Sequence, residues 1–270
     1  MVYTIASLLS VALTGAGTAA PRCAEPAALQ GDYMYTFTTT EENGSPTSGT
    51  VRVYGDRTRI DMQKNNSKDY ILLTDNGTRM LSVHPDRKEV DQINSPSFER
   101  IIGTSLRMVS PIVKFRVLNS KISSERVGTG QKVLGYATEQ IRMTERFDIH
   151  IVAMGFDGGT EHHVIVTDYW VSPGLDLGKN PLLALLEHAG TAMAQTDADF
   201  IEKESAVRAQ ALGGTPLRTV VKSTKVDDKG IEHSSTRTIE ITSIHIGPQS
   251  ASLFEIPSGY RIKSGLNFST

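Results

Sequence analysis

The short spacing of turn residues between positions 32 and 92 constrains the fold more than any other feature of this sequence. Extended segments alternate apolar and polar residues, and the clearest is 33–38, where Tyr33, Tyr35 and Phe37 share one side. Only a few residues with turn chemistry separate these segments, at 42–46, 55–56, 75–77 and 84–87. Consecutive strands joined this closely must be antiparallel, because a parallel pair needs a crossover of about a dozen residues. The sequence therefore predicts an antiparallel meander and excludes a Rossmann-type sheet.

Further strands are predicted within residues 114–172 and 216–262, again from alternation and turns. Among them are separate strands at 133–145 and 147–154, and a turn is predicted at 227–230. In the first of these regions, Gly158-Gly159 is expected to close a hairpin. A turn there would place His150 opposite Thr167, so that His150 and His163 would share a face of the sheet.

Helix-start and helix-stop signals predict three helices, over residues 96–109, 181–195 and 197–212. Together with nine to eleven strands, they predict an α+β fold built on one continuous antiparallel sheet. The chain shows neither a low-complexity linker nor a fixed-period repeat, so residues 31–270 are expected to form a single domain.

The first residues have the pattern of an export signal. Residues 1–21 carry no charge, 5–13 form an apolar run, and small residues follow, which predicts a signal peptide over 1–19 with cleavage after Ala19. Residues 20–30 would then form a flexible mature N-terminus. Arg22 precedes the single cysteine, Cys23, and does not suit a lipoprotein signal, so we expect a protein that is periplasmic or secreted without a lipid anchor.

Overall composition narrows the class of partner. With 28 Lys and Arg against 30 Asp and Glu, the formal charge is −2, which gives no electrostatic reason to bind nucleic acid. Beyond residue 20 no apolar run is long enough to cross a bilayer, so an integral membrane protein is not expected. One cysteine allows no internal disulfide and no multi-thiolate zinc site.

Motifs that carry chemistry are missing from the sequence. It contains no G-x-S-x-G elbow, phosphate loop or dinucleotide fingerprint, so no catalytic residue and no cofactor is predicted. Asp148, His150, His162, His163 and Asp168 form the most tempting set. With the predicted register they cannot converge within the reach of one metal ion, so no metal site is predicted. An uncharacterised hydrolase or metal-binding protein remains an alternative.

Several sequence segments resemble those of a known family. The segment SLFEIPSGY (252–260) and the pattern G-Y-x-x-x-x-Q-I (135–141), in the order of segments described above, are similar to a bacterial exported family of unknown function. That family is related in architecture to the Lol-type periplasmic lipoprotein carriers. The resemblance implies a strongly curved half-barrel sheet with helices over its concave side and an apolar hollow that receives acyl chains. It implies no catalytic residues.

The expected function is therefore non-enzymatic binding or carriage of an apolar ligand, such as a lipid or a lipidated polypeptide. The residues expected to line the hollow or its mouth are Leu182, Leu185, Leu186, Met193 and Trp170. Apolar residues at helical spacing are also what an ordinary core requires. An envelope interaction or structural domain with a filled core is accordingly the main alternative.

Overall fold

The computed structural model describes residues 31–42, 44–63, 68–75, 79–94, 113–153, 156–175, 177 and 198–264. The predicted signal peptide and the predicted helices 96–109 and 181–195 lie outside these residues.

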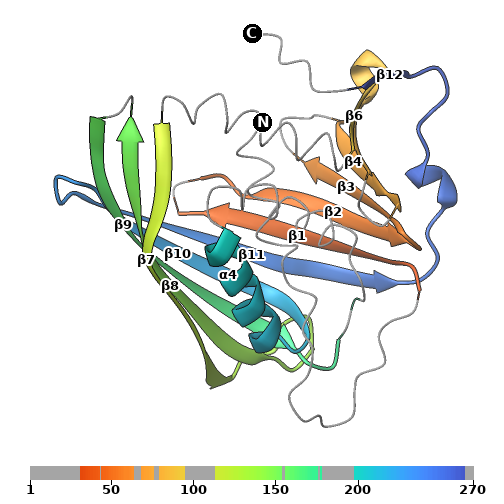
Figure 1. Cartoon of the computed structure of the whole chain (residues 1–270). Coiled ribbons are helices and arrows are strands. Elements are labelled where there is room, and N and C mark those ends of the chain that lie inside the picture. Colours follow the sequence, from red (N-terminus) through yellow and green to blue (C-terminus); the bar gives the residue numbers. More distant parts are fainter. Residues whose placement is uncertain are drawn as a thin grey trace.

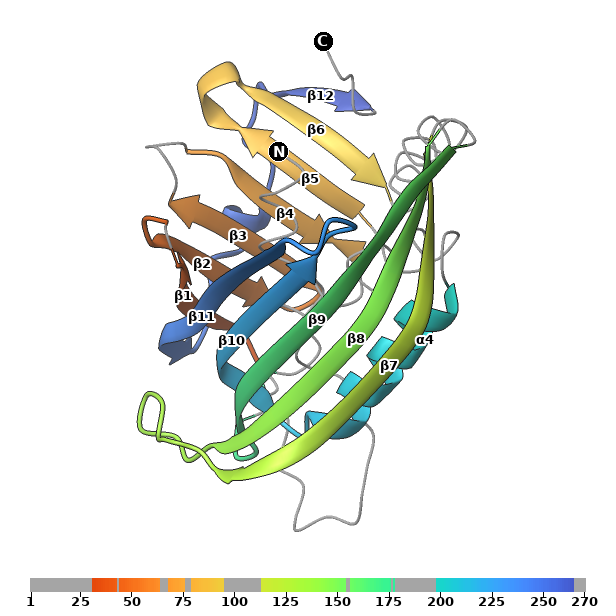
Figure 2. The same ribbon diagram turned by 90° about the vertical axis from the view of Figure 1, so that its left-hand side faces the viewer.

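One sheet of twelve strands dominates the described part of the chain (Figure 1). Its strands are β1 (Tyr33–Glu41), β2 (Thr47–Tyr54), β3 (Arg57–Gln63), β4 (Tyr70–Thr74), β5 (Arg79–His84), β6 (Glu89–Asn94), β7 (Val113–Thr129), β8 (Glu139–Ala153), β9 (Phe156–Ser172), β10 (Thr215–Val226), β11 (Glu232–Ile246) and β12 (Arg261–Ser264). Their order is β12-β6-β5-β4-β3-β2-β1-β11-β10-β9-β8-β7. All neighbours pair antiparallel except β12, which runs parallel to β6. Figure 2 shows that the long, curved strands β7–β9 form one end of this open sheet.

The predicted meander is confirmed. Strands β1 to β6 are neighbours in chain order, and Gly55, with a φ of 55°, stands in the tight turn between β2 and β3. The turn predicted around Asp227–Gly230 joins β10 to β11, where Asp227 accepts hydrogen bonds from the backbone of Lys229 and Ile231. Local turn chemistry therefore set the connections correctly in these regions.

The predicted fold class, α+β with about three helices on the concave side of nine to eleven strands, is wrong. The described residues contain twelve strands and a single α-helix, α4 (Ala198–Ala211), with two short 3₁₀ turns, η2 (Pro85–Arg87) and η3 (Ala251–Phe254). The two strands predicted on either side of residue 146 are one continuous strand of 15 residues, β8. The protein is thus organised by its sheet, and α4 is an addition to it.

The predicted hairpin register is also wrong. Strand β8 ends at Ala153 and β9 begins at Phe156, so the turn precedes Gly158-Gly159. The two glycines instead occupy a bulge, where the pairing changes between His150 and Val152 and Gly159 takes a φ of 91°. Asp148 consequently pairs with His162, and His150 with Thr160.

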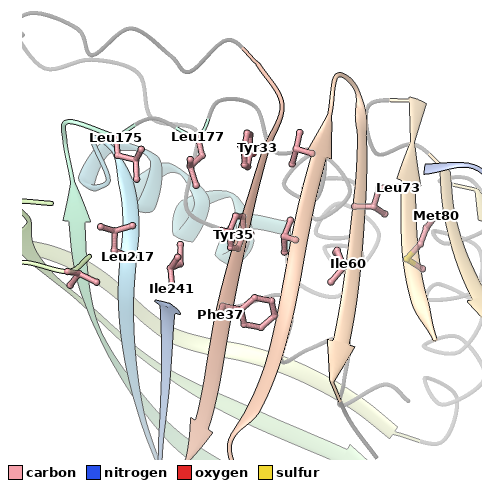
Figure 3. Packing of buried hydrophobic residues seen from close by; sticks show 13 residues of the cluster. Tyr33, Tyr35, Phe37, Ile60, Leu73, Met80, Leu175, Leu177, Leu217 and Ile241 are labelled. Atoms are coloured by element: carbon pink, nitrogen blue, oxygen red, sulfur yellow. The ribbon is translucent and has the colours of Figure 1, made fainter. Parts of the chain in front are cut away.

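One face of the sheet, here called the inner face, carries the main core. Tyr33, Tyr35 and Phe37 of β1 project from it, and strand register places Val51, Ile60 and Ile241 on the same face (Figure 3). Leu175 and Leu177, from the segment after β9, join the same cluster. All these side chains are buried. Helix α4 packs on the inner face at the other end, through Val207, Ala211 and Leu212.

The opposite, outer face carries a buried apolar cluster across β4–β6. Its cluster consists of Tyr70, Leu72, Leu81, Val83 and Val90, and Ile256 and Tyr260 from the C-terminal segment pack against it. Arg59 ties that segment down: its Nη1 donates to the carbonyl oxygen of Leu253 at 3.1 Å, and its guanidinium lies 3.7 Å from the Tyr70 ring centre. This part of the sheet is therefore covered by residues that come from the far end of the sequence.

Candidate functional site

Of the residues that the sequence nominated for an apolar site, only Trp170 lies among the described residues. Leu182, Leu185, Leu186 and Met193 fall outside them. Trp170 is half-buried on β9, packs against the main core cluster, and has the Arg218 guanidinium 5.1 Å from its ring centre. A side chain added at Gly130 would come within 2.8 Å of the indole, so the segment after β7 lies close against it.

The inner face continues past the main core as a half-buried apolar strip on β8–β10. The strip consists of Phe147, Ile149, Ile165 and Val221. All four lie on the inner face. Ile165 lies opposite Glu145, which shares its face with Phe147 and Ile149 along β8, and Val221 lies opposite Thr167, which shares its face with Ile165 along β9. Neighbouring apolar side chains that each keep part of their surface exposed form a surface on which an apolar ligand can lie.

A charged rim borders the strip. Lys225 of β10 contacts Glu161 at 3.0 Å, and Glu161 also lies 3.2 Å from Nε2 of His163. The Lys225 ammonium, followed by His163, holds the pKa of Glu161 below its ordinary value. The His163 ring stacks on Phe147 with 5.1 Å between ring centres, so rim and strip are in direct contact. We call Glu161, His163 and Lys225 the charged rim.

A second group of charges lies beneath α4, where β8 and β9 meet the helix. Glu145 of β8 is 6% exposed, and its Oε1 lies 3.9 Å from Nη2 of Arg208 on the helix. Arg208 also forms an ion pair with Glu204, one helical turn earlier. Tyr169 of β9, itself buried, completes the group. We call these four residues the α4 cluster.

Burial sets the protonation of the α4 cluster. It raises the pKa of Glu145 to about 7; the Glu204 carboxylate raises it as well, and Arg208 partly opposes both. Burial also raises the pKa of the Tyr169 hydroxyl. The sequence analysis missed this group. The available signal was a glutamate in an inward position of an alternating strand, together with an arginine on a nearby helix.

His84, at the β6 end of the inner face, has two acidic neighbours and a serine. Its Nδ1 lies 3.0 Å from Asp69, and its Nε2 lies 3.2 Å from Asp91 and 3.3 Å from the Ser82 hydroxyl. This composition resembles a serine-nucleophile triad, but Ser82 stands within β5, which is paired on both sides, so the backbone N–H groups around it serve the sheet. The His84 Nε2 atom also lies within hydrogen-bonding distance of Asp91, so it does not serve Ser82 alone. The group lacks the free N–H donors that a nucleophilic serine needs to stabilise an oxyanion.

The histidine and aspartate set on β8 and β9 is divided between the two faces. Nδ1 of His162 lies 2.6 Å from Asp148, which also accepts a hydrogen bond from Asn119, and these contacts lower the Asp148 pKa, Asn119 contributing most. Asp168 instead pairs with Arg142 at 2.8 Å. Across the described ranges, no group of three His, Cys, Asp or Glu side chains is placed to hold a metal ion.

Comparisons with known proteins add little. The sequence matches no known family and no curated protein. Among solved structures it is similar to an uncharacterized conserved protein from Thermus thermophilus, with 10% identity over 87% of this chain and 91% of that one and a TM-score of 0.38. Similarity at this level supports neither a family nor a function. No helix in the described residues is long and apolar enough to span a membrane.

Proposed function

We propose that this protein binds an elongated amphiphile, the acyl chain of a lipid or of a lipidated polypeptide, without chemically transforming it. The observation that carries the proposal is the half-buried apolar strip of Phe147, Ile149, Ile165 and Val221, with the charged rim at its border. An acyl chain would lie along the strip, and its polar head would lie at the charged rim, beside the ion pair of Lys225 and Glu161. The resemblance to Lol-type carriers favours the same class of ligand.

Apolar burial is the expected source of the affinity. Burial of each methylene group contributes about 0.8 kcal/mol, so ten methylenes contribute about 8 kcal/mol before the losses of ligand freedom on binding. About 15 methylenes would contribute about 12 kcal/mol, and after a loss of about 4 kcal/mol on binding about 8 kcal/mol remains, which corresponds to a dissociation constant near the micromolar range. A chain of ordinary fatty-acid length therefore suffices, and no strong polar recognition of the head group is needed.

The proposed location follows from the first 19 residues, whose pattern is that of an export signal. We propose that the mature protein is periplasmic or secreted. Such a location gives an acyl-binding protein a role in moving or holding lipids or lipidated polypeptides in the envelope.

A second candidate is an envelope interaction domain whose interior is filled. The centre of the inner face favours it, because Tyr35, Phe37 and Leu217 are each exposed by 3% or less. The two candidates differ only in whether the half-buried strip on β8–β10 accepts a ligand, so an experiment on that strip separates them.

The test uses two adjacent residues of β9 that face opposite sides of the sheet. Ile165→Glu places a carboxylate on the strip, whereas Val166→Glu places one on the outer face, where Val166 is also half-buried. A fluorescent fatty-acid probe should bind the unmodified protein at about micromolar affinity. Ile165→Glu should weaken that binding by at least about tenfold, through the cost of desolvating the carboxylate, and Val166→Glu should not.

Circular dichroism and thermal unfolding of both variants would show that the sheet is intact. Native mass spectrometry of protein purified from its own envelope, followed by lipid extraction, would then identify the natural ligand. Absence of probe binding to the unmodified protein, or equal weakening by both variants, would contradict the proposal and favour the filled interaction domain.

A further inference from the structure

Helix α4 covers an apolar part of the inner face next to the strip. The sheet residues beneath it are Ile122, Ile141, Met143, Tyr169 and Val171. Among the described side chains on the helix side, Val207 and Ala211 of α4 and Leu212 just after it pack against them. Polar contacts between the helix and the sheet add to this apolar packing.

The α4 cluster supplies such an interaction, and its charges do not balance. Glu145 on the sheet and Glu204 on the helix both approach the guanidinium of Arg208. With both carboxylates ionised, two negative charges share one positive charge in a site where Glu145 is 6% exposed. A net buried charge is costly, and a single proton on the cluster removes it.

The groups that face Glu145 come from each element packed around it. The helix contributes Glu204 and Arg208, and β9 contributes the Tyr169 hydroxyl. Its neighbours across the strands are apolar: Ile122 on β7 and Ile165 on β9. Arg208 is the one cation among these described groups, which is why the site cannot hold two carboxylates at no cost.

The chain leaving α4 passes from an unpacked residue, Gly213, to a tightly packed one, Gly214. Gly213 follows the helix and has open space on all sides of the position where a Cβ would stand. Gly214 is fixed, because a Cβ there would lie 2.2 Å from the carbonyl oxygen of Ser172. A helix pivoting at Gly213 would therefore move against an anchored neighbour, as a hinge requires.

We propose that α4 is a movable cover over the inner face, which stays closed while the α4 cluster holds a proton and lifts when that proton is lost. Lifting exposes Ile141 and Met143, which continue the apolar strip along β8 through Glu145 to Phe147 and Ile149. The inference rests on the proposed function in one respect: the surface so exposed extends the proposed acyl site. The raised pKa of Glu145, about 7, sets the pH at which the cover changes state.

Hydrogen exchange of the α4 amides tests the cover without any ligand. With a pKa of about 7 in the closed state and an ordinary value of 4.5 when open, the opening equilibrium increases about tenfold between about pH 6 and about pH 8.5. A helix of 14 residues is only marginally stable in water without packing, so its amides lose their hydrogen bonds once it lifts from the sheet. After correction for the intrinsic pH dependence of exchange, protection of α4 should therefore fall by that factor. Protection in β1 and β11 should change far less.

Two variants and one control sharpen the result. Glu145→Gln removes the titrating carboxylate, and Glu204→Gln leaves one carboxylate facing one guanidinium, so either change should reduce the pH effect to less than about twofold. Glu125→Gln, an exposed position on β7, should leave the tenfold change intact. Having two variants keeps the test decisive if one of them folds poorly.

The inference would be overturned if α4 protection were independent of pH in the unmodified protein, or if both variants kept the full pH effect. Probe binding reports separately on the proposed function. A pH-dependent α4 without probe binding would remove the acyl ligand and keep the cover, whereas probe binding with a pH-independent α4 would do the reverse.

Discussion

The substitution Glu145→Gln should change how the stability of this protein depends on pH. The Glu145 carboxyl is buried between β8 and α4, and its pKa is raised from 4.5 to about 7. The free-energy difference between these two values is about 3 kcal/mol, at 1.36 kcal/mol for each pH unit. Ionisation of this one buried carboxyl therefore changes the stability by about a fifth or more of the 5–15 kcal/mol typical of a whole domain.

The direction of the effect follows from proton binding. Between pH 4.5 and about 7 the folded protein keeps the Glu145 proton and the unfolded chain releases it. Raising the pH through this window therefore favours the unfolded chain, and the free energy of unfolding falls by about 3 kcal/mol in total. Below 4.5 both states hold the proton, and above about 7 neither does, so this contribution changes no further.

Urea denaturation of the unmodified protein and of Glu145→Gln, at intervals from about pH 4 to about pH 8.5, measures the effect. Every other titrating group is common to both proteins and cancels in the difference, apart from direct neighbours of the cluster. The unmodified protein should lose about 3 kcal/mol relative to the variant across the range. Two parallel stability curves would refute the assignment of a buried, proton-holding carboxyl to Glu145.

Two further predictions concern other parts of the chain. Gly214→Ala should destabilise the protein by about 1–3 kcal/mol, because the new methyl group would overlap the carbonyl of Ser172. Gly213→Ala, where a methyl group meets open space, should change the free energy of unfolding by less than about 0.5 kcal/mol in the same denaturation assay. Equal effects of the two substitutions would contradict the packing described. N-terminal sequencing of mature protein should begin at or near Ala20, and recovery of intact Met1 from the cytoplasm would exclude export.

The sequence was most informative where structure is local. Turn residues such as Gly55 and Gly230, which adopt positive φ, fixed the hairpins of the meander and of β10–β11 correctly. Pairing in these hairpins is determined within a dozen residues, so local chemistry decides it. The neighbours β1 and β11, by contrast, are separated by about 190 residues, and no local signal specified that they would pair.

The errors arose where a long-range contact overrides the local pattern. Two shorter strands, divided at residue 146, were predicted in place of β8, in which the polar Glu145 stands within the alternation of Ile141, Met143, Phe147 and Ile149. The carboxyl faces inward all the same, because Arg208 from α4 accompanies it there. The register of β8 and β9 failed for a related reason: Gly158-Gly159 is typical of a turn, and a bulge needs the same conformational freedom.

The candidate site also combines features that local sequence can predict with contacts between distant segments that it cannot. Register and residue type together define the apolar strip, but its register became known only from the structure, and the α4 cluster depends on a contact between segments about 60 residues apart. The nominated residues Leu182, Leu185, Leu186 and Met193 lie outside the described residues, and their proposed role remains a prediction.

The origin of the outer-face covering has a consequence for how the chain comes to be folded. Tyr70, Leu72, Leu81, Val83 and Val90 are completed by Ile256 and Tyr260, and β6 gains its parallel neighbour only from residues 261–264. Emerging from a ribosome or a translocation pore, the first third of the chain would present an apolar surface and an unpaired strand edge until some 170 later residues had followed. Completion of the sheet is thus tied to release of the last part of the polypeptide, and the interval before release is when the chain is most exposed to aggregation and to capture by chaperones.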